Sequence, residues 1–378
     1  MRIGFTSDFH LGFGVGKRRD EAVKQAIRAM QTLKKQKVDL IINTGDVFDT
    51  VVPRPEALRD AAQVFATCPI RAPLQGINRP DSSVGVLALH GNHERRIKGE
   101  VNPVELLEHL GLVTYLHNSG VVADGAEFFG VGSVPETYAP KVFQQMKIRP
   151  TTDQPSFFLF HQNLRPYVPT KDSLDFSDLP AGFNYYVNGH IHTPRLEKNL
   201  LITGSTVMTS LTKAEAEKKV WVWEDGQFES FTFPTRPFIH IDITADGQTP
   251  LQLVKRVNAA VEEALTAKAL ADFDESPLVR VVVRGKMAPG CRPGELVLRS
   301  LPEFGDAAVY FDKKLDTEGL TGEAGLETIN ISELTTDAFR EVLKTRQPDL
   351  DPSILYDLLM REDWEGVWHV LTREVTKS

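Results

Sequence analysis

Residues 3–12 read Ile-Gly-Phe-Thr-Ser-Asp-Phe-His-Leu-Gly, a short apolar run followed closely by a carboxylate and an imidazole. The pattern predicts a buried strand over residues 3–6, with Asp8 and His10 just beyond it. Four later segments repeat the arrangement, each after its own apolar run, so all five are predicted to lie at strand ends and to meet at one rim. They are Gly45-Asp46-Val47-Phe48-Asp49, Gly91-Asn92-His93-Glu94, His161-Gln162-Asn163 and Gly189-His190-Ile191-His192.

Apolar runs alternate with amphipathic stretches over roughly the first 230 residues, which is typical of layered α/β proteins. Amphipathic periodicity predicts helices over residues 20–35 and 55–65. A hairpin is predicted over residues 220–233, with its turn at Asp225-Gly226. The other predicted strands cover residues 3–6, 40–43, 84–89, 128–131, 157–160, 185–187 and 200–203.

A break at Pro234-Thr235-Arg236-Pro237 separates residues 1–233 from a smaller α/β module over residues 234–315. Residues 316–378 are predicted to form a linker and then helices, the last of which carries Trp364 and Trp368 on its apolar face. That face either packs on its own domain or meets a partner. In the second module we expect strands over residues 238–243, 278–283 and 307–311, a helix from 250 to about 270 and a short helix near 294–301.

Composition limits the class of protein. The chain has 378 residues, 41% of them hydrophobic, and no apolar run approaches the ~20 residues that span a bilayer. The N-terminus has no signal-peptide core, and Cys68 and Cys291 are too few for a disulfide framework, so a cytoplasmic location is expected. The net charge of −8 argues against tight, unaided binding of nucleic acid unless positive charge is local or supplied by a partner.

The five segments carry the side chains that bind transition metals. Carboxylate, imidazole and one amide oxygen suit manganese, iron or zinc, and differ from the all-oxygen set of a calcium site. Side chains two apart on a strand face the same way, so Asp8 and His10, like His190 and His192, are predicted to point into one pocket. The glycines before three of the segments' polar residues should let the backbone turn sharply and approach the metals. Each segment alone has an ordinary structural explanation, whereas five in this order predict a metal centre.

In this order the segments resemble the five signature motifs of the calcineurin-like metallophosphoesterases. Thr-Ser-Asp-Phe-His-Leu-Gly, Gly-Asp-Val-Phe-Asp-Thr, Gly-Asn-His-Glu and Gly-His-Ile-His more narrowly resemble the SbcD-type nucleases. These are the nuclease subunits of SbcC–SbcD complexes and prokaryotic relatives of the eukaryotic meiotic-recombination nuclease. The motif match covers residues 1–210, and the later regions match in position and size only. The resemblance implies a four-layer sandwich, two mixed sheets flanked by helices, followed by a smaller α/β capping domain and a C-terminal helical segment.

The resemblance also implies roles for residues of the five segments. His93 would be the acid or electrostatic stabiliser beside the phosphate, and Glu94 would orient it. Asp49 stands where some members carry histidine, and an orienting role suits it best. Two manganese ions are implied, with magnesium or another divalent metal as the alternative. One ion would be held by Asp8, His10 and His192, the other by Asn92, His161 and His190, with Asp46 bridging them.

The implied activity is that of a manganese-dependent DNA nuclease in double-strand-break repair, an exonuclease on duplex ends and an endonuclease on single strands. An SbcC-like coiled-coil ATPase would dock on the C-terminal helices, and a homodimer would form through helices near residues 55–65 and 103–110. A phosphoesterase for a small phosphodiester or a phosphoprotein stays open as the alternative. Protein phosphatases usually carry arginines where this chain has Thr50 and His90, which favours the nuclease. A metal-free scaffold is disfavoured because every expected ligand is present.

Basic residues flank the same segments and are candidates for DNA phosphate contacts. Lys17, Lys98 and Lys171 lie among them. The histidines outside the segments are predicted to be structural or exposed, and they are His90, His109, His117, His240 and His369. The predicted phosphate contacts are Arg18, Arg19, Arg95, Arg96 and Arg165.

Overall fold

The computed structural model describes residues 1–95, 99–266, 275–298 and 307–316. The chain divides into two compact units, Met1–Asp316 and Thr317–Ser378. The second unit, with the predicted linker and C-terminal helices, lies outside the described residues. Among the described helices, none combines the length and the apolar character needed to cross a membrane.

The first sheet has six strands in the order β14–β13–β1–β2–β5–β6. Strands β1, β2, β5 and β6 run parallel, and the hairpin β13–β14 is added antiparallel beside β1. Parallel strands with both faces covered have continuous apolar sequences, which is why residues 3–6 and 40–43 could be recognised as strands. In sheet order the bounds are Gln227–Thr232, Lys219–Glu224, Ile3–Thr6, Leu40–Asn43, Val86–Ala88 and Thr114–Tyr115.

The second sheet has eight strands in the order β11–β12–β10–β9–β8–β7–β3–β4. Its central strands β8, β9, β10 and β12 run parallel, and the outer strands are antiparallel. In sheet order the bounds are Arg195–Glu197, Leu200–Ile202, Tyr185–Asn188, Ser156–Phe160, Ala126–Val131, Ser119–Ala123, Arg71–Ile77 and Ser82–Val84.

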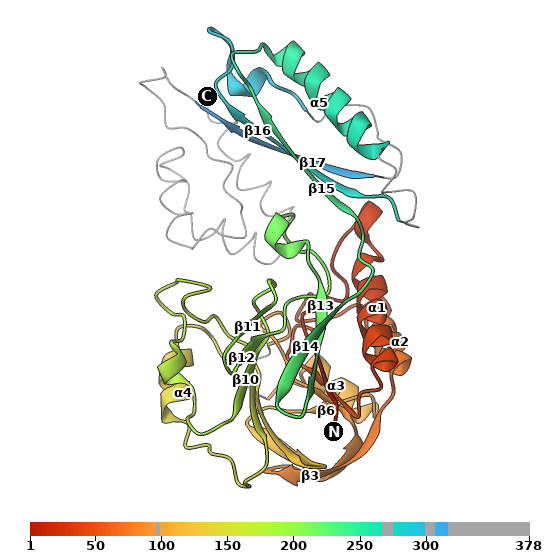
Figure 1. Cartoon of the computed structure of the whole chain (residues 1–378), viewed down its shortest axis with the longest axis vertical. Coiled ribbons are helices and arrows are strands. Elements are labelled where there is room, and N and C mark those ends of the chain that lie inside the picture. The colour runs from red at the N-terminus through yellow and green to blue at the C-terminus, as the bar shows by residue number, and fades with distance from the viewer. Residues whose placement is uncertain (96–98, 267–274, 299–306, 317–378) are drawn as a thin grey trace, which may run out of the picture. The chain divides into compact units, whose positions relative to one another are not determined.

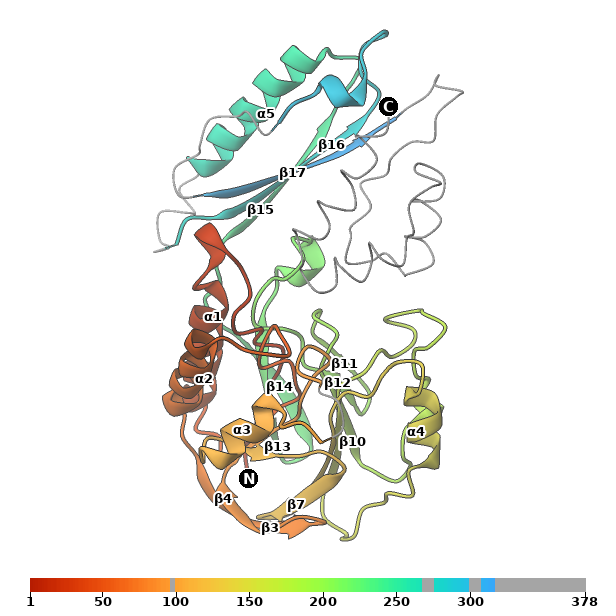
Figure 2. The ribbon, with the colours of Figure 1, turned by 180° about the vertical axis from the view of Figure 1, so that it is seen from behind.

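Neighbouring side chains of one strand enter different cores, and this builds four layers. Ile42 packs between the two sheets, whereas Ile41 packs on the outer face of the six-stranded sheet. That outer face is covered by α1 (Glu21–Lys35), α2 (Pro55–Thr67) and α3 (Pro103–His109). Helix α4 (Ala139–Gln145) covers the eight-stranded sheet, on the opposite side in Figures 1 and 2. The predicted α/β sandwich is confirmed.

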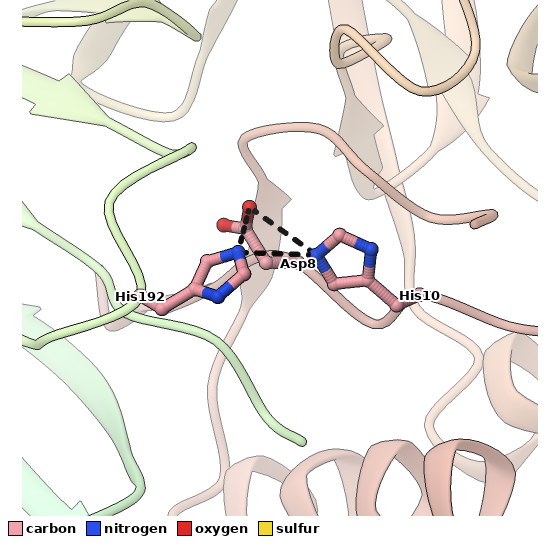
Figure 3. A group of neighbouring side chains, drawn as sticks. All are labelled: Asp8, His10 and His192. Carbon is pink, nitrogen blue, oxygen red and sulfur yellow. Dashed lines mark hydrogen bonds and ion pairs between the residues drawn. The ribbon is translucent and has the colours of Figure 1, made fainter. Parts of the chain in front are cut away.

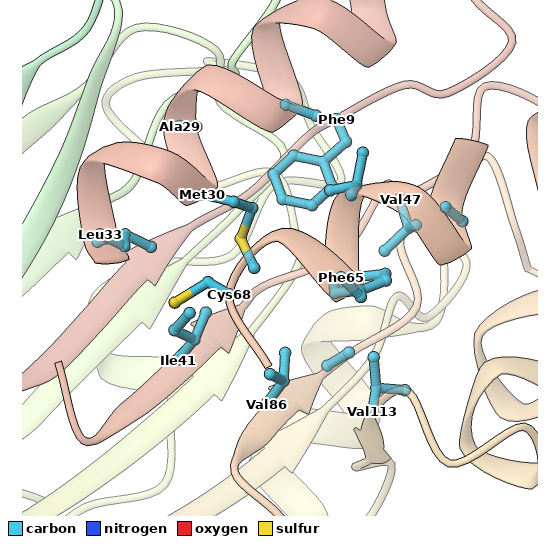
Figure 4. Close-up of a cluster of buried hydrophobic side chains, with 14 of the residues drawn as sticks. Phe9, Ala29, Met30, Leu33, Ile41, Val47, Phe65, Cys68, Val86 and Val113 are labelled. Atoms are coloured by element: carbon cyan, nitrogen blue, oxygen red, sulfur yellow. The ribbon is translucent and has the colours of Figure 1, made fainter. Parts of the chain in front are cut away.

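The outer core also anchors two of the polar segments. Phe9 and Val47 are fully buried in the cluster of Figure 4, against Met30 of α1 and Phe65 of α2. Phe9 lies between Asp8 and His10 in the chain. Burial of these apolar side chains, each contributing on the order of 1.5–3 kcal/mol, therefore fixes the backbone that presents the carboxylates and imidazoles.

Two details of the strand prediction were wrong. The single strand predicted over residues 84–89 is two strands, β4 and β5, which belong to different sheets. The chain changes sheet at Gly85, where an added Cβ would lie 2.6 Å from Cγ2 of Ile70. Strands β3, β6, β7 and β11 were not predicted. Strands β6 and β11 have only two and three residues, β3 contains Pro73 and a single buried residue, and β7 begins Ser-Gly.

Residues 238–315 contain a parallel sheet in the order β15–β16–β17, packed against α5. Helix α5 begins with a capping box of Thr249 and Gln252. Near residue 294 the structure has a three-residue 3₁₀ turn, Pro293–Glu295, in place of the expected short helix, and residues 299–306 lie outside the described chain. The domain boundaries remain predictions. The elements are β15 (Phe238–Thr244), α5 (Pro250–Leu265), β16 (Leu278–Gly285) and β17 (Ala308–Leu315).

Candidate metal centre

The five polar segments follow strands β1, β2, β5, β9 and β10, which are parallel core strands of the two sheets. Carboxyl ends of parallel strands share one edge of a sheet, and ligand sites form there. Four of the seven predicted ligands are almost fully buried, and the structure brings all seven together. The four are Asp8, His10, Asp46 and His161, each at most 1% exposed.

The side chains converge by a different route from the one predicted. Strand β1 ends at Thr6 and β10 at Asn188, so strand alternation does not aim the polar side chains. At four of the seven candidate ligands the backbone is instead left-handed, a conformation that costs on the order of 1–3 kcal/mol for residues other than glycine. Four of the ten described residues other than glycine with a positive φ lie at this one site, which suggests a functional constraint there. The φ angles are 51° at Asp8, 48° at His10, 48° at Asp46 and 68° at His190.

The glycines of these segments lie tightly against neighbouring site residues, and their predicted approach to metal ions stays a prediction. A Cβ on Gly91 would lie 1.8 Å from Oδ1 of Asp46. A Cβ on Gly189 would lie 2.5 Å from the carbonyl oxygen of Thr44. A side chain at either position would displace the loop that carries a candidate ligand.

The first cluster consists of Asp8, His10 and His192 (Figure 3). Nε2 of His10 lies 3.2 Å from Nε2 of His192. Oδ1 of Asp8 lies 3.9 Å from Nε2 of His10 and 3.7 Å from Nε2 of His192. The three atoms therefore surround one small volume.

The second cluster adjoins the first through Asp46. Oδ2 of Asp46 lies 3.3 Å from Nε2 of His161 and 3.9 Å from Nε2 of His10. Oδ1 of Asn92 lies 3.1 Å from Nε2 of His161 and 2.8 Å from Nδ1 of His190. One carboxylate oxygen thus faces both groups, as the predicted bridging role requires.

Each of the four histidines uses its other ring nitrogen in a hydrogen bond. At His10, His161 and His190 the outer partner is an acceptor, which favours the ring proton there and, in the neutral imidazole, turns a lone pair toward the cluster. The hydroxyl beside His192 is compatible with a proton on either ring nitrogen. Lone pairs and carboxylate oxygens that face one another need a proton or a metal ion between them, and this donor set fits divalent metal ions. The outer pairs are His10 Nδ1 with Asp49 Oδ1 (3.1 Å), His161 Nδ1 with Thr44 O (2.8 Å), His190 Nε2 with Asn163 Oδ1 (2.8 Å) and His192 Nδ1 with Thr209 Oγ1 (2.7 Å).

Electrostatics of the metal-free protein lead to the same conclusion. Burial lowers the pKa of His161, but the Asp46 carboxylate outweighs burial and raises that pKa to about 9. Burial raises the pKa of Asp46, yet His161 and His10 hold it well below its usual range. The carboxylates therefore favour positive charge among them, which a bound cation provides.

His93 and Asp49 lie at the open side of the centre. The His93 side chain is 39% exposed, and its Nδ1 lies 3.1 Å from the carbonyl oxygen of Asp49. Oδ1 of Asp49 lies 3.1 Å from Nδ1 of His10 and 3.7 Å from Nδ1 of His93. Asp49 is thus placed between a candidate ligand and the candidate catalytic histidine, where the predicted orienting role is geometrically possible.

The prediction that Glu94 orients His93 is wrong. Glu94 is fully buried, and its carboxylate accepts hydrogen bonds from the backbone amides of Phe48 at 2.5 Å and Gly91 at 2.8 Å. Burial raises its pKa to about 8. Glu94 instead ties the loop of Asp46 to the loop of Asn92, so its role is to hold two ligand-bearing segments together.

The predicted phosphate contacts differ in accessibility. Arg18 is buried, is paired with Glu21 and donates to the carbonyl oxygen of Met208, so that prediction is wrong. Arg165 forms a two-pronged ion pair with Asp175 at the surface. The phosphate contacts of Arg19, Arg95 and Arg165 remain predictions: Arg19 is exposed, and the other two are half-buried. Arg96 lies outside the described residues.

Comparison with known proteins now defines the class. Residues 1–194 match the family model of the calcineurin-like phosphoesterases, so the chain belongs to that family. It is accordingly a metal-dependent phosphoesterase, and the predicted family is confirmed.

Comparison with individual proteins is more specific than the family model. The chain is 30% identical over 220 residues to the DNA double-strand break repair protein Mre11 of Methanopyrus kandleri. The aligned stretch covers 53% of this chain and 46% of that protein. Identity to Mre11 of Saccharolobus solfataricus is 28%, over 82% of this chain and 81% of the relative. Identity to Mre11 of Methanocaldococcus jannaschii is 25%, over 97% of this chain and 96% of the relative. The chain thus spans about half of the first relative and nearly all of the last.

Apart from Asp49, the partners of the outer ring nitrogens were missed by sequence reasoning. Asn163 stands two residues after His161 in a recognised segment, and its polar side chain at a strand end was a usable signal. Thr209 and Glu215, whose Oε1 lies 3.5 Å from Nδ1 of His192, follow the last segment without any motif. Only the fold places them beside His192.

Proposed function

We propose that this protein is a DNA nuclease of double-strand-break repair that hydrolyses phosphodiesters at a two-metal centre. The observation that carries the proposal is the pair of clusters that share Oδ2 of Asp46, with every outer histidine nitrogen already hydrogen-bonded. The Mre11 relatives support DNA as the substrate. The proposed ligands are Asp8, His10 and His192 for one ion, Asn92, His161 and His190 for the other, and Asp46 for both.

When bound, the two ions would neutralise phosphate charge and lower the pKa of a water molecule. The residues of the chain do the rest. His93 points its Nδ1 at the Asp49 carbonyl, which leaves the other edge of the exposed ring to meet a phosphate or leaving oxygen. Asp49 orients the rings of His10 and His93 from the same side.

Manganese is the metal we propose, with magnesium or another divalent ion as the alternative. Four imidazoles beside two carboxylates and one amide are softer than the mostly oxygen sets that magnesium prefers. A manganese titration of chelator-treated protein should show two bound ions per chain. Fewer than two would contradict the shared role of Asp46.

We further propose that the protein works with a coiled-coil ATPase of the SbcC type and pairs as a homodimer. The helices proposed to dock the ATPase lie outside the described residues. Near α3, Leu106 is 37% and Leu110 60% exposed, which supports an apolar contact with a second copy. Light scattering at micromolar concentration should give the mass of a dimer. The net charge of −8 fits a protein that leaves part of DNA binding to its partner.

The decisive experiment compares two substrates. Duplex DNA labelled at either end is incubated with manganese or magnesium, with and without the ATPase, beside a chromogenic phosphodiester. We expect metal-dependent release of labelled DNA fragments that His93→Asn abolishes. Turnover of the small ester without any cleavage of DNA would support the rival function, a small-molecule phosphodiesterase.

A further inference from the structure

We infer that Glu215 is a positioning residue for His192, because its carboxylate decides which ring nitrogen of His192 carries the proton. The inference rests on the proposed metal centre and extends it to a residue outside the five segments. With the proton on Nδ1, the lone pair of Nε2 faces Asp8 and His10.

Two oxygen atoms meet Nδ1 of His192. Oγ1 of Thr209 lies at 2.7 Å and Oε1 of Glu215 at 3.5 Å. A hydroxyl can either donate or accept, so Thr209 alone is compatible with a proton on Nδ1 or with a bare Nδ1. A carboxylate only accepts, and its negative charge beside Nδ1 favours the proton there. Glu215 therefore selects between two arrangements that Thr209 leaves open.

The choice matters because of what lies on the other side of the ring. Nε2 of His192 is 3.2 Å from Nε2 of His10 and 3.7 Å from Oδ1 of Asp8. A metal ligand has to be a neutral imidazole with a bare nitrogen toward the ion. A proton on Nε2 would fill the space of the cation and remove one ligand from the first cluster.

Glu215 is held in one position by its own surroundings. It ends the 3₁₀ turn Lys213–Glu215, and its Oε2 accepts from the backbone amides of Thr209 at 3.1 Å and Ser210 at 3.2 Å. The ammonium of Lys218 lies 3.8 Å from the same oxygen, and the side chains of Lys218 and Glu215 are 1% and 10% exposed. A buried ion pair and two backbone donors together hold the carboxylate in this position. This preorganisation is what a positioning role requires.

The test compares Glu215→Gln with a matched control, Glu217→Gln. Glutamine keeps the size and an acceptor for the two amides but removes the charge. Glu217 is two residues further on, 63% exposed, and paired with Lys219 at 2.9 Å. Each full-length protein is stripped of metal with a chelator and titrated with Mn²⁺ by calorimetry and electron paramagnetic resonance. We expect Glu215→Gln to bind one ion as in the wild type and the other about 10–100-fold more weakly, whereas Glu217→Gln binds both normally.

A second measurement does not depend on the folding of any variant at position 215. Nitrogen chemical shifts of the histidine rings in metal-free wild-type protein report which nitrogen of each ring is protonated. The His192 signal is assigned by its loss in His192→Gln. We expect Nδ1 to carry the proton.

Two results would overturn the inference. One is a proton on Nε2 of His192, and the other is wild-type affinity for both ions in a folded Glu215→Gln. A wild-type protein that binds fewer than two ions would instead refute the proposed metal centre, and the tautomer measurement would still judge Glu215.

Discussion

The two halves of the metal centre share Asp46 but differ in the residues that support them. In the first half the outer nitrogens face carboxylates, since Asp49 lies 3.1 Å from His10 and Glu215 lies 3.5 Å from His192. Asp8 adds a buried carboxylate inside the cluster. This half therefore concentrates negative charge around its cation.

The second half relies on neutral partners. The outer nitrogen of His161 meets the backbone carbonyl of Thr44, and that of His190 meets the amide oxygen of Asn163. Inside the cluster, Asn92 contributes an amide where the first half has a carboxylate. Because Coulomb attraction grows with the charge around an ion, the first half should retain its cation more tightly and the second should exchange it more readily.

The largest effect is expected from the residue that both halves share. Asp46→Asn should weaken both ions, and turnover should fall by more than the ~10–100-fold that follows loss of a merely orienting partner. His190→Ala is the matched variant, because it removes a ligand of the second half only. Calorimetry with Mn²⁺ should show two weakened ions in the first variant and one in the second. One unaffected ion in Asp46→Asn would show that the halves are independent.

His93→Asn should lower turnover by about 10²–10⁴-fold while both halves keep their ions. His93 reaches the open side of the centre and lies outside the two clusters described above, although with His10 and Asp49 it forms a third group whose atoms could hold a cation. Stopped-flow or end-point cleavage of labelled DNA measures the loss, and metal analysis of the same preparation is the control. Release of an ion by this substitution would place His93 among the ligands instead.

Loss of an orienting partner should have a smaller effect, and it should affect only the half of the centre to which that partner belongs. Asp49→Asn removes a charge beside His10, and Asn163→Leu removes the acceptor beside His190. Each variant should lower the affinity for one ion by about 10–100-fold, and the two variants should affect different ions. The change at Asp49 should be the larger, because it removes charge as well as a hydrogen bond. Equal weakening of both ions by either variant would contradict the division into halves.

How far the sequence predicts this site depends on where each partner lies in the chain. The seven candidate ligands follow short apolar runs, so their types and positions could be read directly. The role of Glu94 could not, because it accepts from the amide of Phe48, which only the fold brings near. The burial of Arg18 could not either, because its ion pair with Glu21 is local but its contact with the carbonyl of Met208 depends on the fold. Convergence was predicted for the wrong reason, since left-handed loops and not strand alternation aim Asp8 at the centre.

His90 shows how structural and functional histidines differ in their contacts. It precedes Gly91 directly, yet both of its nitrogens are occupied, Nδ1 by the hydroxyl of Tyr115 at 2.7 Å and Nε2 by the carbonyl of Ser133 at 3.2 Å. Each candidate ligand, in contrast, keeps one nitrogen for the cluster. The sequence reading of His90 as structural agrees with these contacts.

Substitution of His90 is expected to have the smallest effect on activity, together with a measurable effect on stability. Burial lowers its pKa from 6.5 to about 3 in the folded protein. Between these values the unfolded chain binds a proton that the folded chain does not, so the free energy of unfolding falls as pH drops through this window. The slope from this one group is up to about 1.4 kcal/mol per pH unit.

In His90→Gln that contribution disappears, so its free energy of unfolding should depend less steeply on pH between about 6.5 and 3 than that of the wild type. Urea unfolding in the presence of a chelator measures both proteins without bound metal, and binding of Mn²⁺ at neutral pH should be the same in both. Identical pH slopes would mean that folded His90 accepts a proton despite its two hydrogen bonds. Occupied nitrogens would then no longer distinguish a structural histidine from the ligands beside it.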